Sequence, residues 1–189
     1  MKRLFVIFAL LIMSSTATAG IQECKFKSEF SDMQWYNIRD VFAQAWSADL
    51  SWTMSAIIIA ESSAGSYTIN HRTQDYGIMQ NNIKTATTRL KEWEKDGRDF
   101  GPYDLDSQED VRGLLLLNRD ISIKLAIEEI NFWKKVRGEH QWNEIFASYN
   151  GGYYHDTPRH ERSESYSQKI VSIIRKLKPC ASLLTKGLF

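Results

Sequence analysis

The chain has 189 residues, of which 43% are hydrophobic, and its 24 basic and 23 acidic side chains almost cancel. This balance of charge gives no reason to expect nucleic acid or another polyanion as a partner. The length suits one domain with a substantial core, and no repeat, low-complexity tract or linker divides it.

Residues 1–19 have the pattern of a secretory signal peptide. Lys2 and Arg3 precede an apolar run that ends at Met13, and Ala-Thr-Ala closes the segment at Ala19. The run is too short to span a bilayer, which favours cleavage over a membrane anchor. We therefore expect residues 20–189 to form the single domain, in the periplasm or outside the cell.

The two cysteines, Cys24 and Cys180, lie near the ends of this expected mature chain. An even number of cysteines in an exported protein predicts a disulfide, and two free thiols are the alternative.

Hydrophobic residues at helical spacing predict a mainly helical protein. Ser31 or Asp32, Ser51, and Asp106 with Glu109 are the expected caps of three helices. In chain order, the expected helices cover residues 31–46, 51–62, 82–94, 107–117, 119–137, 139–149 and 165–178. Between them we expect a small hairpin within 62–76, a loop at 96–106 and a polar loop at 153–165.

Glu61 ends the apolar stretch "SWTMSAIIIAES". Burial and the negative end of the helix dipole both favour its protonated form, which a general acid needs near neutral pH. The alternative is an acid that reaches solvent where the helix surfaces.

Two further clusters contain residues suited to a binding site. In "DYGIMQ", Gly77 permits a tight backbone, Met79 is an adaptable apolar side chain and Gln80 both donates and accepts hydrogen bonds. In "ASYNGG", Tyr149 and Asn150 offer polar groups at the end of an apolar helix. Taken alone, the first is also an ordinary turn and the second an ordinary helix stop.

Together, in this order, the three clusters resemble the motifs of the soluble lytic transglycosylases, which are related in fold to goose-type lysozyme. The resemblance covers roughly residues 50–175 and implies a mainly α, lysozyme-like domain. "DYGIMQ-N" is most similar to the small members found with secretion and conjugation systems, and "YSQKIVSII" resembles the closing helix of the family.

The resemblance implies a role for each matching residue. Glu61 would be the single catalytic acid and base, Ser62 would orient the site, and the hydroxyl of Tyr149 would hydrogen-bond the Glu61 carboxyl. The substrate-binding residues implied in this way are Gly77, Met79, Gln80 and Asn150. The sequence departs from the pattern at Ser148 and Gly151, where alanine is common, and residues 92–106 look like an insertion that shapes the cleft.

The implied reaction is cleavage of the β-1,4 bond between N-acetylmuramic acid and N-acetylglucosamine, with 1,6-anhydro ends as products and no metal or cofactor. Two alternatives remain. A second carboxylate, Asp75 or Asp156, would indicate a hydrolytic muramidase, that is, a lysozyme. A non-catalytic peptidoglycan-binding component of a secretion apparatus is the other.

Other partners follow from the same interpretation. We expect a monomer that acts on peptidoglycan strands, with a secretion or conjugation apparatus as a further partner and no nucleic acid. No metal site is expected at His71, His140, His155 or His160, because none pairs with another at a helical spacing typical of metal ligands.

Overall fold

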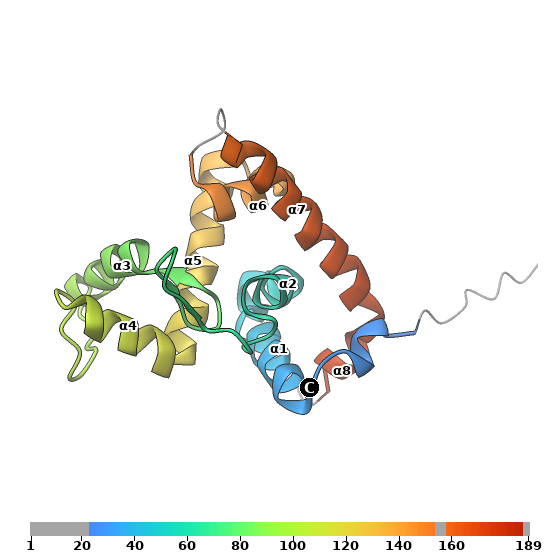
Figure 1. Ribbon diagram of the computed structural model, residues 1–189, viewed down its shortest axis with the longest axis horizontal. Helices are drawn as coiled ribbons and strands as arrows, with labels where there is room; N and C mark the ends of the chain where they lie inside the picture. Colours follow the sequence, from blue (N-terminus) through green and yellow to red (C-terminus); the bar gives the residue numbers. More distant parts are fainter. Residues whose placement is uncertain (1–22, 154–157, 187–189) are drawn as a thin grey trace, which may run out of the picture.

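A computed structural model describes residues 23–153 and 158–186, so the expected signal peptide lies outside the described residues. The protein is mainly helical, as predicted (Figure 1). Its α-helices are α1 (Asp32–Gln44), α2 (Ser51–Ser62), α3 (Ile83–Lys95), α4 (Gln108–Leu117), α5 (Arg119–Arg137), α6 (Trp142–Gly151), α7 (Pro158–Leu177) and α8 (Ala181–Leu184). Short 3-10 helices are η1 (Lys25–Ser28), η2 (Trp46–Ala48) and η3 (Lys178–Cys180).

Of the two residues predicted to cap α1, Ser31 is the one that does so. Its side chain accepts a hydrogen bond from the Gln34 backbone, and the Gln34 side chain accepts one from the Ser31 backbone, which completes a capping box. The predicted cap of α2 is wrong, because Ser51 is already the first helical residue. Its hydroxyl instead donates to the Phe42 carbonyl at 2.8 Å and ties α2 to α1.

Three other boundaries differ from the predictions. Ser107, rather than Asp106, caps α4 and accepts from the backbone N–H of Asp110. Helix α6 begins at Trp142, later than expected. The predicted polar loop ends early because α7 begins at Pro158; proline has no N–H to donate and suits the first turn of a helix.

The predicted hairpin is present and has a third strand. Strands β1 (Ile69–Asn70), β2 (Asp75–Tyr76) and β3 (Asn81–Asn82) form an antiparallel sheet in that order. Within it, Asp75 lies opposite both Asn70 and Asn82. The sheet joins α2 to α3 and brings the "DYGIMQ" segment back toward the end of α2.

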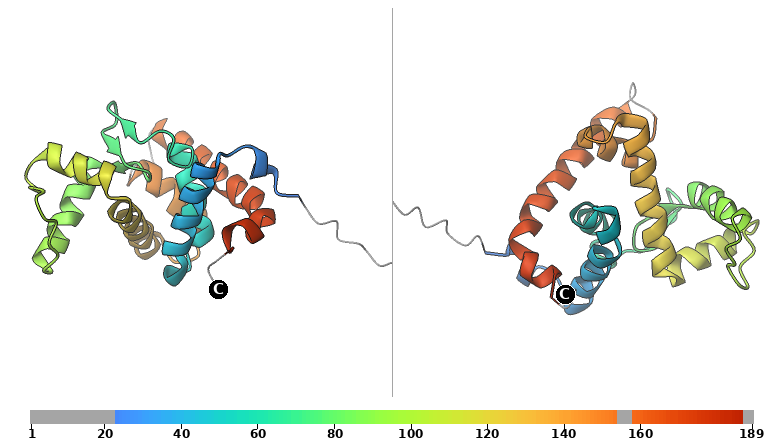
Figure 2. Two further views of the ribbon diagram at one scale, coloured as in Figure 1. Left: turned by 90° about the horizontal axis from the view of Figure 1, so that it is seen from below. Right: turned by 180° about the vertical axis from the view of Figure 1, so that it is seen from behind.

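Helix α2 is the centre of the larger of two hydrophobic clusters. Figure 1 shows α2 enclosed by α1, α6 and α7, and the residues of the cluster also come from α5, η1 and α8. The second cluster lies between α3, α4 and α5. The two further views show α3 and α4 as a lobe on the side of α5 that faces away from α2 (Figure 2). Helix α5 therefore supplies both clusters and links the lobe to the central bundle.

The segment 92–106 covers the second cluster. The Trp93 and Phe100 rings stack with centroids 6.4 Å apart, and the Arg98 guanidinium lies 4.1 Å from the Trp93 centroid. Leu105 is buried in the same cluster. None of the helices in residues 23–153 and 158–186 is long and apolar enough to cross a membrane.

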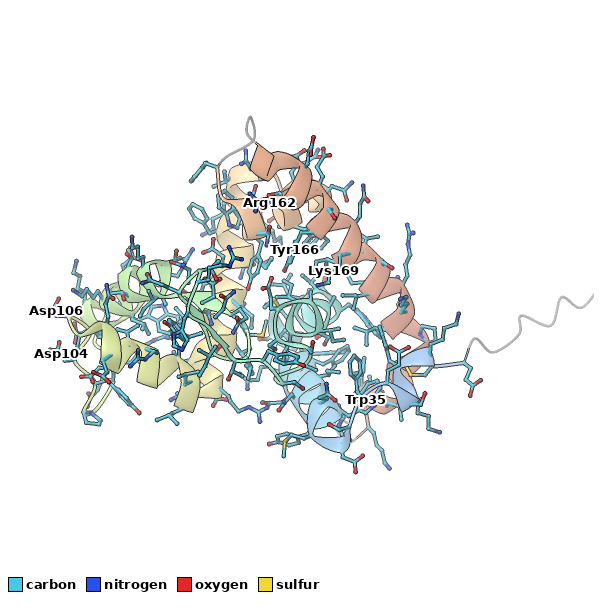
Figure 3. The ribbon with its side chains drawn as sticks, in the orientation of Figure 1. Trp35, Asp104, Asp106, Arg162, Tyr166 and Lys169 are labelled. Atoms are coloured by element: carbon cyan, nitrogen blue, oxygen red, sulfur yellow. A yellow bond between two sulfur atoms is a disulfide. The ribbon has the colours of Figure 1, made fainter. Side chains whose placement is uncertain are left out.

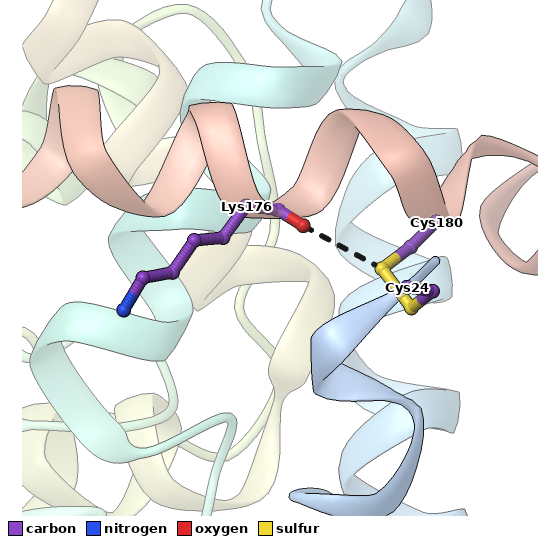
Figure 4. The surroundings of a disulfide bond; sticks show 3 residues. All are labelled: Cys24, Lys176 and Cys180. Carbon is purple, nitrogen blue, oxygen red and sulfur yellow. Dashed lines mark hydrogen bonds between the residues drawn. A yellow bond between two sulfur atoms is a disulfide. The ribbon is translucent and has the colours of Figure 1, made fainter. Parts of the chain in front are cut away.

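The predicted disulfide between Cys24 and Cys180 is confirmed (Figure 4). It joins the chain just before η1 to the end of η3, directly after α7, and closes a loop of 156 residues in sequence separation. The Cys180 sulfur also lies 3.7 Å from the Lys176 carbonyl oxygen. Because a disulfide sulfur carries no hydrogen, this second contact is packing.

Replacing both Cys24 and Cys180 by alanine is expected to lower the free energy of unfolding by roughly 2–5 kcal/mol, because the bridge restricts almost the whole unfolded chain. Urea unfolding of the oxidised parent and of the variant measures the difference. A thiol titration of the unreduced, unfolded parent should find no free thiol, and two titratable thiols would contradict the bridge.

Candidate active site

Glu61 lies in the last turn of α2, where the chain leaves the core. Ser63 and Ala64 follow in the left-handed region, with φ of 50° and 57°. Two side chains from α1 hold this turn: Gln34 donates to the Ser63 carbonyl at 2.9 Å and Asn37 donates to the Ala64 carbonyl at 2.8 Å. The position of Glu61 is thus fixed by the neighbouring helix and not only by α2.

Tyr166 from α7 is the hydrogen-bond partner of Glu61. Its hydroxyl donates to Oε1 of Glu61 at 2.5 Å. Burial raises the pKa of Tyr166 well above its ordinary value, so the phenol remains a neutral donor. Since one carboxyl oxygen is occupied in this way, the acidic proton of Glu61 is left to the other oxygen.

Burial raises the pKa of Glu61 to about 7. The hydrogen bond from Tyr166 and the charge of Lys169 lower it, while the charge of Asp75 raises it. Desolvation prevails, because removing a carboxylate from water opposes ionisation more strongly than these partners favour it. The sequence-based expectation that the protonated form is favoured is therefore confirmed.

Lys169 also contacts the end of α2 directly. Its ammonium donates to the Ala60 carbonyl at 3.0 Å, one residue before the acid. Arg162, Tyr166 and Lys169 have the helical spacing of residues on one face of α7. Figure 3 shows them along the side of α7 that faces α2.

A cleft of about 1250 Å³ opens beside Glu61. Its walls come from the end of α2, the hairpin, α3, α5, α6 and α7, so it runs between the central bundle and the lobe. Four of the predicted residues line it: Glu61, Gln80, Tyr149 and Asn150. The site thus brings together residues from all three sequence clusters.

Gly77 and Ser122 hold the "GIMQ" turn against the ends of α4 and α5. Gly77 has φ of 81°, and a Cβ there would lie 2.5 Å from the Leu115 carbonyl oxygen and 2.7 Å from the Ser122 hydroxyl. Ser122 Oγ accepts hydrogen bonds from the Met79 N–H and from the Asn81 amide, at 3.3 and 2.8 Å. Position 77 requires glycine because the backbone of α4 approaches it closely. Nothing in the sequence indicated this role of Ser122.

Ser62, Gly77 and Met79 support the cleft from behind. The prediction that Met79 and Gly77 line it is wrong: Met79 is fully buried in the core, and neither is among the described residues of the cleft wall. Ser62 donates to the Ile78 carbonyl at 2.7 Å and accepts from the Gly65 N–H at 2.8 Å. This buried hydroxyl ties the end of α2 to the "GIMQ" turn.

Tyr149 does not make its predicted hydrogen bond to Glu61. Its hydroxyl lies 3.5 Å from the Met79 carbonyl oxygen, and Tyr166 takes the place at the acid. The two tyrosine rings are nearly parallel, with centroids 6.4 Å apart. Burial raises the pKa of Tyr149 well above its ordinary value, so this phenol is neutral too.

Gln80 and Asn150 present polar groups to the cleft. Gln80 has φ of 50°, and its side-chain amide donates to the Gly77 carbonyl at 2.9 Å. Its left-handed backbone is held by the turn it closes. Asn150 is exposed at the cleft wall in the last turn of α6.

Gly151 marks a close crossing of α6 and α7. A Cβ added there would lie 2.2 Å from the Ser163 hydroxyl and 3.2 Å from its Cβ. Glycine at position 151, where alanine is common in the family, therefore leaves room for the Ser163 side chain. An alanine there would force Ser163 to move.

Residues 92–106 do not shape the cleft, contrary to expectation: all are described and none lines it. Figure 3 shows Asp104 and Asp106 at the outer edge of the α3–α4 lobe, far from Tyr166. Asp106 forms an ion pair with Lys91 beside a separate hollow of about 260 Å³.

The two candidates for a second carboxylate have different outcomes. Asp75 lines the cleft, where its carboxylate accepts from the Asn82 amide at 3.0 Å. Asp156 lies outside the described residues, as does His155. Among the described residues, no three His, Cys, Asp or Glu side chains form a group that could hold a metal ion.

A model of the "Transglycosylase SLT domain" family matches residues 42–172. The chain belongs to this family. The match includes the site from Glu61 to Lys169 and fits the lysozyme-like, mainly helical fold. No significantly similar curated protein or solved structure was found. Membership implies transglycosylase activity on peptidoglycan.

Tyr166→Phe is expected to raise the pKa of Glu61 above about 7, because its hydroxyl stabilises the ionised form. A ¹³C NMR titration of the carboxyl group measures this value. Tyr149→Phe is the matched control, and it should leave the Glu61 midpoint unchanged. A Glu61 pKa that rises in Tyr149→Phe and is unchanged in Tyr166→Phe would show that Tyr149 is the hydrogen-bond donor to Glu61, as first predicted.

The free energy of unfolding of Glu61→Gln is expected to rise relative to that of the parent as pH increases. The pKa of Glu61 rises from 4.5 to about 7 on folding, so its contribution to stability is fully present below 4.5 and is lost as pH rises through 7. Glutamine removes this loss. Relative to the parent, the variant should gain roughly 3 kcal/mol between about pH 4 and about pH 8, as measured by urea unfolding. An equal difference at both pH values would contradict the raised pKa.

Proposed function

We propose that this protein is a lytic transglycosylase that cleaves the β-1,4 bond between N-acetylmuramic acid and N-acetylglucosamine and leaves 1,6-anhydro ends. The observation that carries the proposal is the state of Glu61. Its pKa is about 7, a neutral tyrosine fixes one of its oxygens, and it lines a cleft of about 1250 Å³. Such a group can act as both acid and base near neutral pH.

In the first step, protonated Glu61 donates its proton to the glycosidic oxygen, and the bond from that oxygen to C1 of the muramic acid breaks. N-acetylglucosamine leaves with the proton on its O4 hydroxyl. The positive charge at C1 is stabilised by the acetamido group of the same sugar. Tyr166 holds Oε1 throughout, so the proton is transferred from Oε2.

In the second step, the Glu61 carboxylate accepts the proton of the muramic acid C6 hydroxyl as O6 bonds to C1. The product is the 1,6-anhydro sugar, and Glu61 is protonated again. Because the nucleophile belongs to the substrate, one carboxyl group suffices where most glycosidases use two.

The charges of the cleft favour an acidic glycan over a neutral one. Arg72, Lys84 and Arg162 line it without an ion-pair partner among the described residues, whereas Arg89 is paired with Glu129 at 2.5 Å. Muramic acid carries a lactyl carboxylate or, through it, an acidic peptide, but chitin carries neither. Complementary charge supports peptidoglycan as the substrate class.

A hydrolytic muramidase is the second candidate, and Asp75 is the observation that favours it. Its carboxylate lies in the same cleft and its charge acts on Glu61. A second carboxylate that activated water would give free reducing ends.

The setting of the enzyme is part of the same proposal. The signal-peptide pattern of residues 1–19 and the disulfide support export to the periplasm or beyond, since such bridges persist in oxidising compartments. A monomeric enzyme that serves a secretion or conjugation apparatus remains a prediction from the "DYGIMQ-N" segment.

Glu61→Gln should reduce cleavage of purified murein by about a hundredfold to ten-thousandfold, because it removes the positioned general acid. End-group analysis of the parent digest should find 1,6-anhydro ends, and Asp75→Asn should still produce them. Free reducing ends that disappear in Asp75→Asn would identify a muramidase. A parent that binds murein but never cleaves it would be a binding component.

A further inference from the structure

An exposed tyrosine packs against neighbouring side chains just after α6 ends. Tyr153 is 62% exposed, yet its ring packs against two others, with its centroid 4.9 Å from that of Trp133 and 6.4 Å from that of Phe132. The Arg137 guanidinium lies 5.8 Å from the same ring. Single exposed aromatic side chains are common on protein surfaces, but this one is supported on its inner side by three neighbours.

Ser148 anchors the guanidinium that supports this ring. Arg137 Nε donates to Ser148 Oγ at 2.9 Å, and its guanidinium lies 5.5 Å from the Trp133 centroid. Ser148 stands where alanine is common in the enzymes that the sequence resembles. Alanine would leave Nε without this acceptor, so the departure has a local purpose: it fixes Arg137 against Trp133 and Tyr153.

The supported ring is adjacent to the wall of the cleft. Trp133, Ser148, Gly151 and Gly152 all line the cleft, and Tyr153 is the next residue in the chain. Trp133 is itself oriented by a hydrogen bond of 2.6 Å to Glu129 on the same helix. Tyr153 therefore lies directly beyond the α5–α6 side of the cleft wall, in ring contact with Trp133, which lines it.

We propose that Tyr153 forms a stacking subsite for a pyranose ring of the glycan strand, away from the bond that is cleaved. One face of a pyranose is rich in C–H groups and packs well on the face of an aromatic ring. A tyrosine can make this contact while its hydroxyl, at the edge of the ring, stays in water. The inner contacts fix the ring before the sugar arrives, so little side-chain freedom is lost on binding. The subsite rests on the proposed function for its occupant, an amino sugar of peptidoglycan.

The test uses Glu61→Gln as the inactive parent and measures its binding to murein glycan oligosaccharides of two to about twelve sugars by calorimetry. Adding Tyr153→Ala should weaken binding of the longest oligosaccharides by about tenfold, the scale expected for loss of one aromatic stack, and leave the disaccharide unaffected. Tyr153→Phe should bind as the parent does, because it retains the ring.

Tyr67→Ala is the matched control. Tyr67 is 71% exposed, does not line the cleft, and has no aromatic or cationic ring contact among the described residues, so its loss should not change binding. In the protein that retains Glu61, Tyr153→Ala should raise KM for long strands and leave kcat unchanged. Its thermal unfolding midpoint should remain close to that of the parent, which shows that the variant is folded.

Two results would overturn the subsite, and they differ in what they imply. If the parent binds glycan and Tyr153→Ala binds it equally at every length, the stacking proposal is wrong and the proposed function stands. If the parent binds no glycan of any length, the subsite falls together with the proposed function.

Discussion

The burial of one carboxyl group at the end of the most apolar helix is the constraint on which the site depends. Helix α2 is buried along most of its length, and Glu61 in its last turn lies beside the cleft. The same burial that gives this acid a pKa of about 7 also makes it a source of instability once it ionises. The neighbouring elements supply the hydrogen bonds that hold it in place.

Those neighbours have separate tasks. Helix α1 satisfies the carbonyl groups of the turn after Glu61, through Gln34 and Asn37. Helix α7 supplies the donor to the carboxyl group and a cation beside it. The "GIMQ" turn, held by Ser62 and by the start of α5, supports the cleft from behind and presents Gln80 to it. The active centre is therefore assembled from segments far apart in sequence, each fixed to the core separately.

The sequence predicted the helices and the position of the acid because these depend on local patterns. An apolar run that ends at Glu61 is visible without a structure, and so is the spacing of α5. The partner of Glu61 was not visible in this way. Tyr149 and Tyr166 both lie on amphipathic helices, and a difference in the rotation of each helix decides which hydroxyl reaches the carboxyl group.

Other misses have the same origin in three-dimensional contact. Met79 belongs to a motif that ends at the cleft with Gln80, but the turn directs its side chain into the core, and its carbonyl oxygen lies 3.5 Å from the Tyr149 hydroxyl. Ser122 had no local signal, because its role exists only where α5 meets that turn. Helix α7 begins earlier than predicted because Pro158 suits the first turn of a helix, and the charged side chains of Glu161 and Arg162 are exposed while the helix continues.

The crossing of α6 and α7 at Gly151 and Ser163 has a consequence for how such sites diversify. A larger residue at one position demands a smaller one at the other, so the two should change as a compensating pair. Ser163 is one turn before Tyr166 on the same helix, and any shift at the crossing moves the hydroxyl that Glu61 needs. The identity of two small residues that never touch the acid thereby limits which substitutions the chemistry can survive.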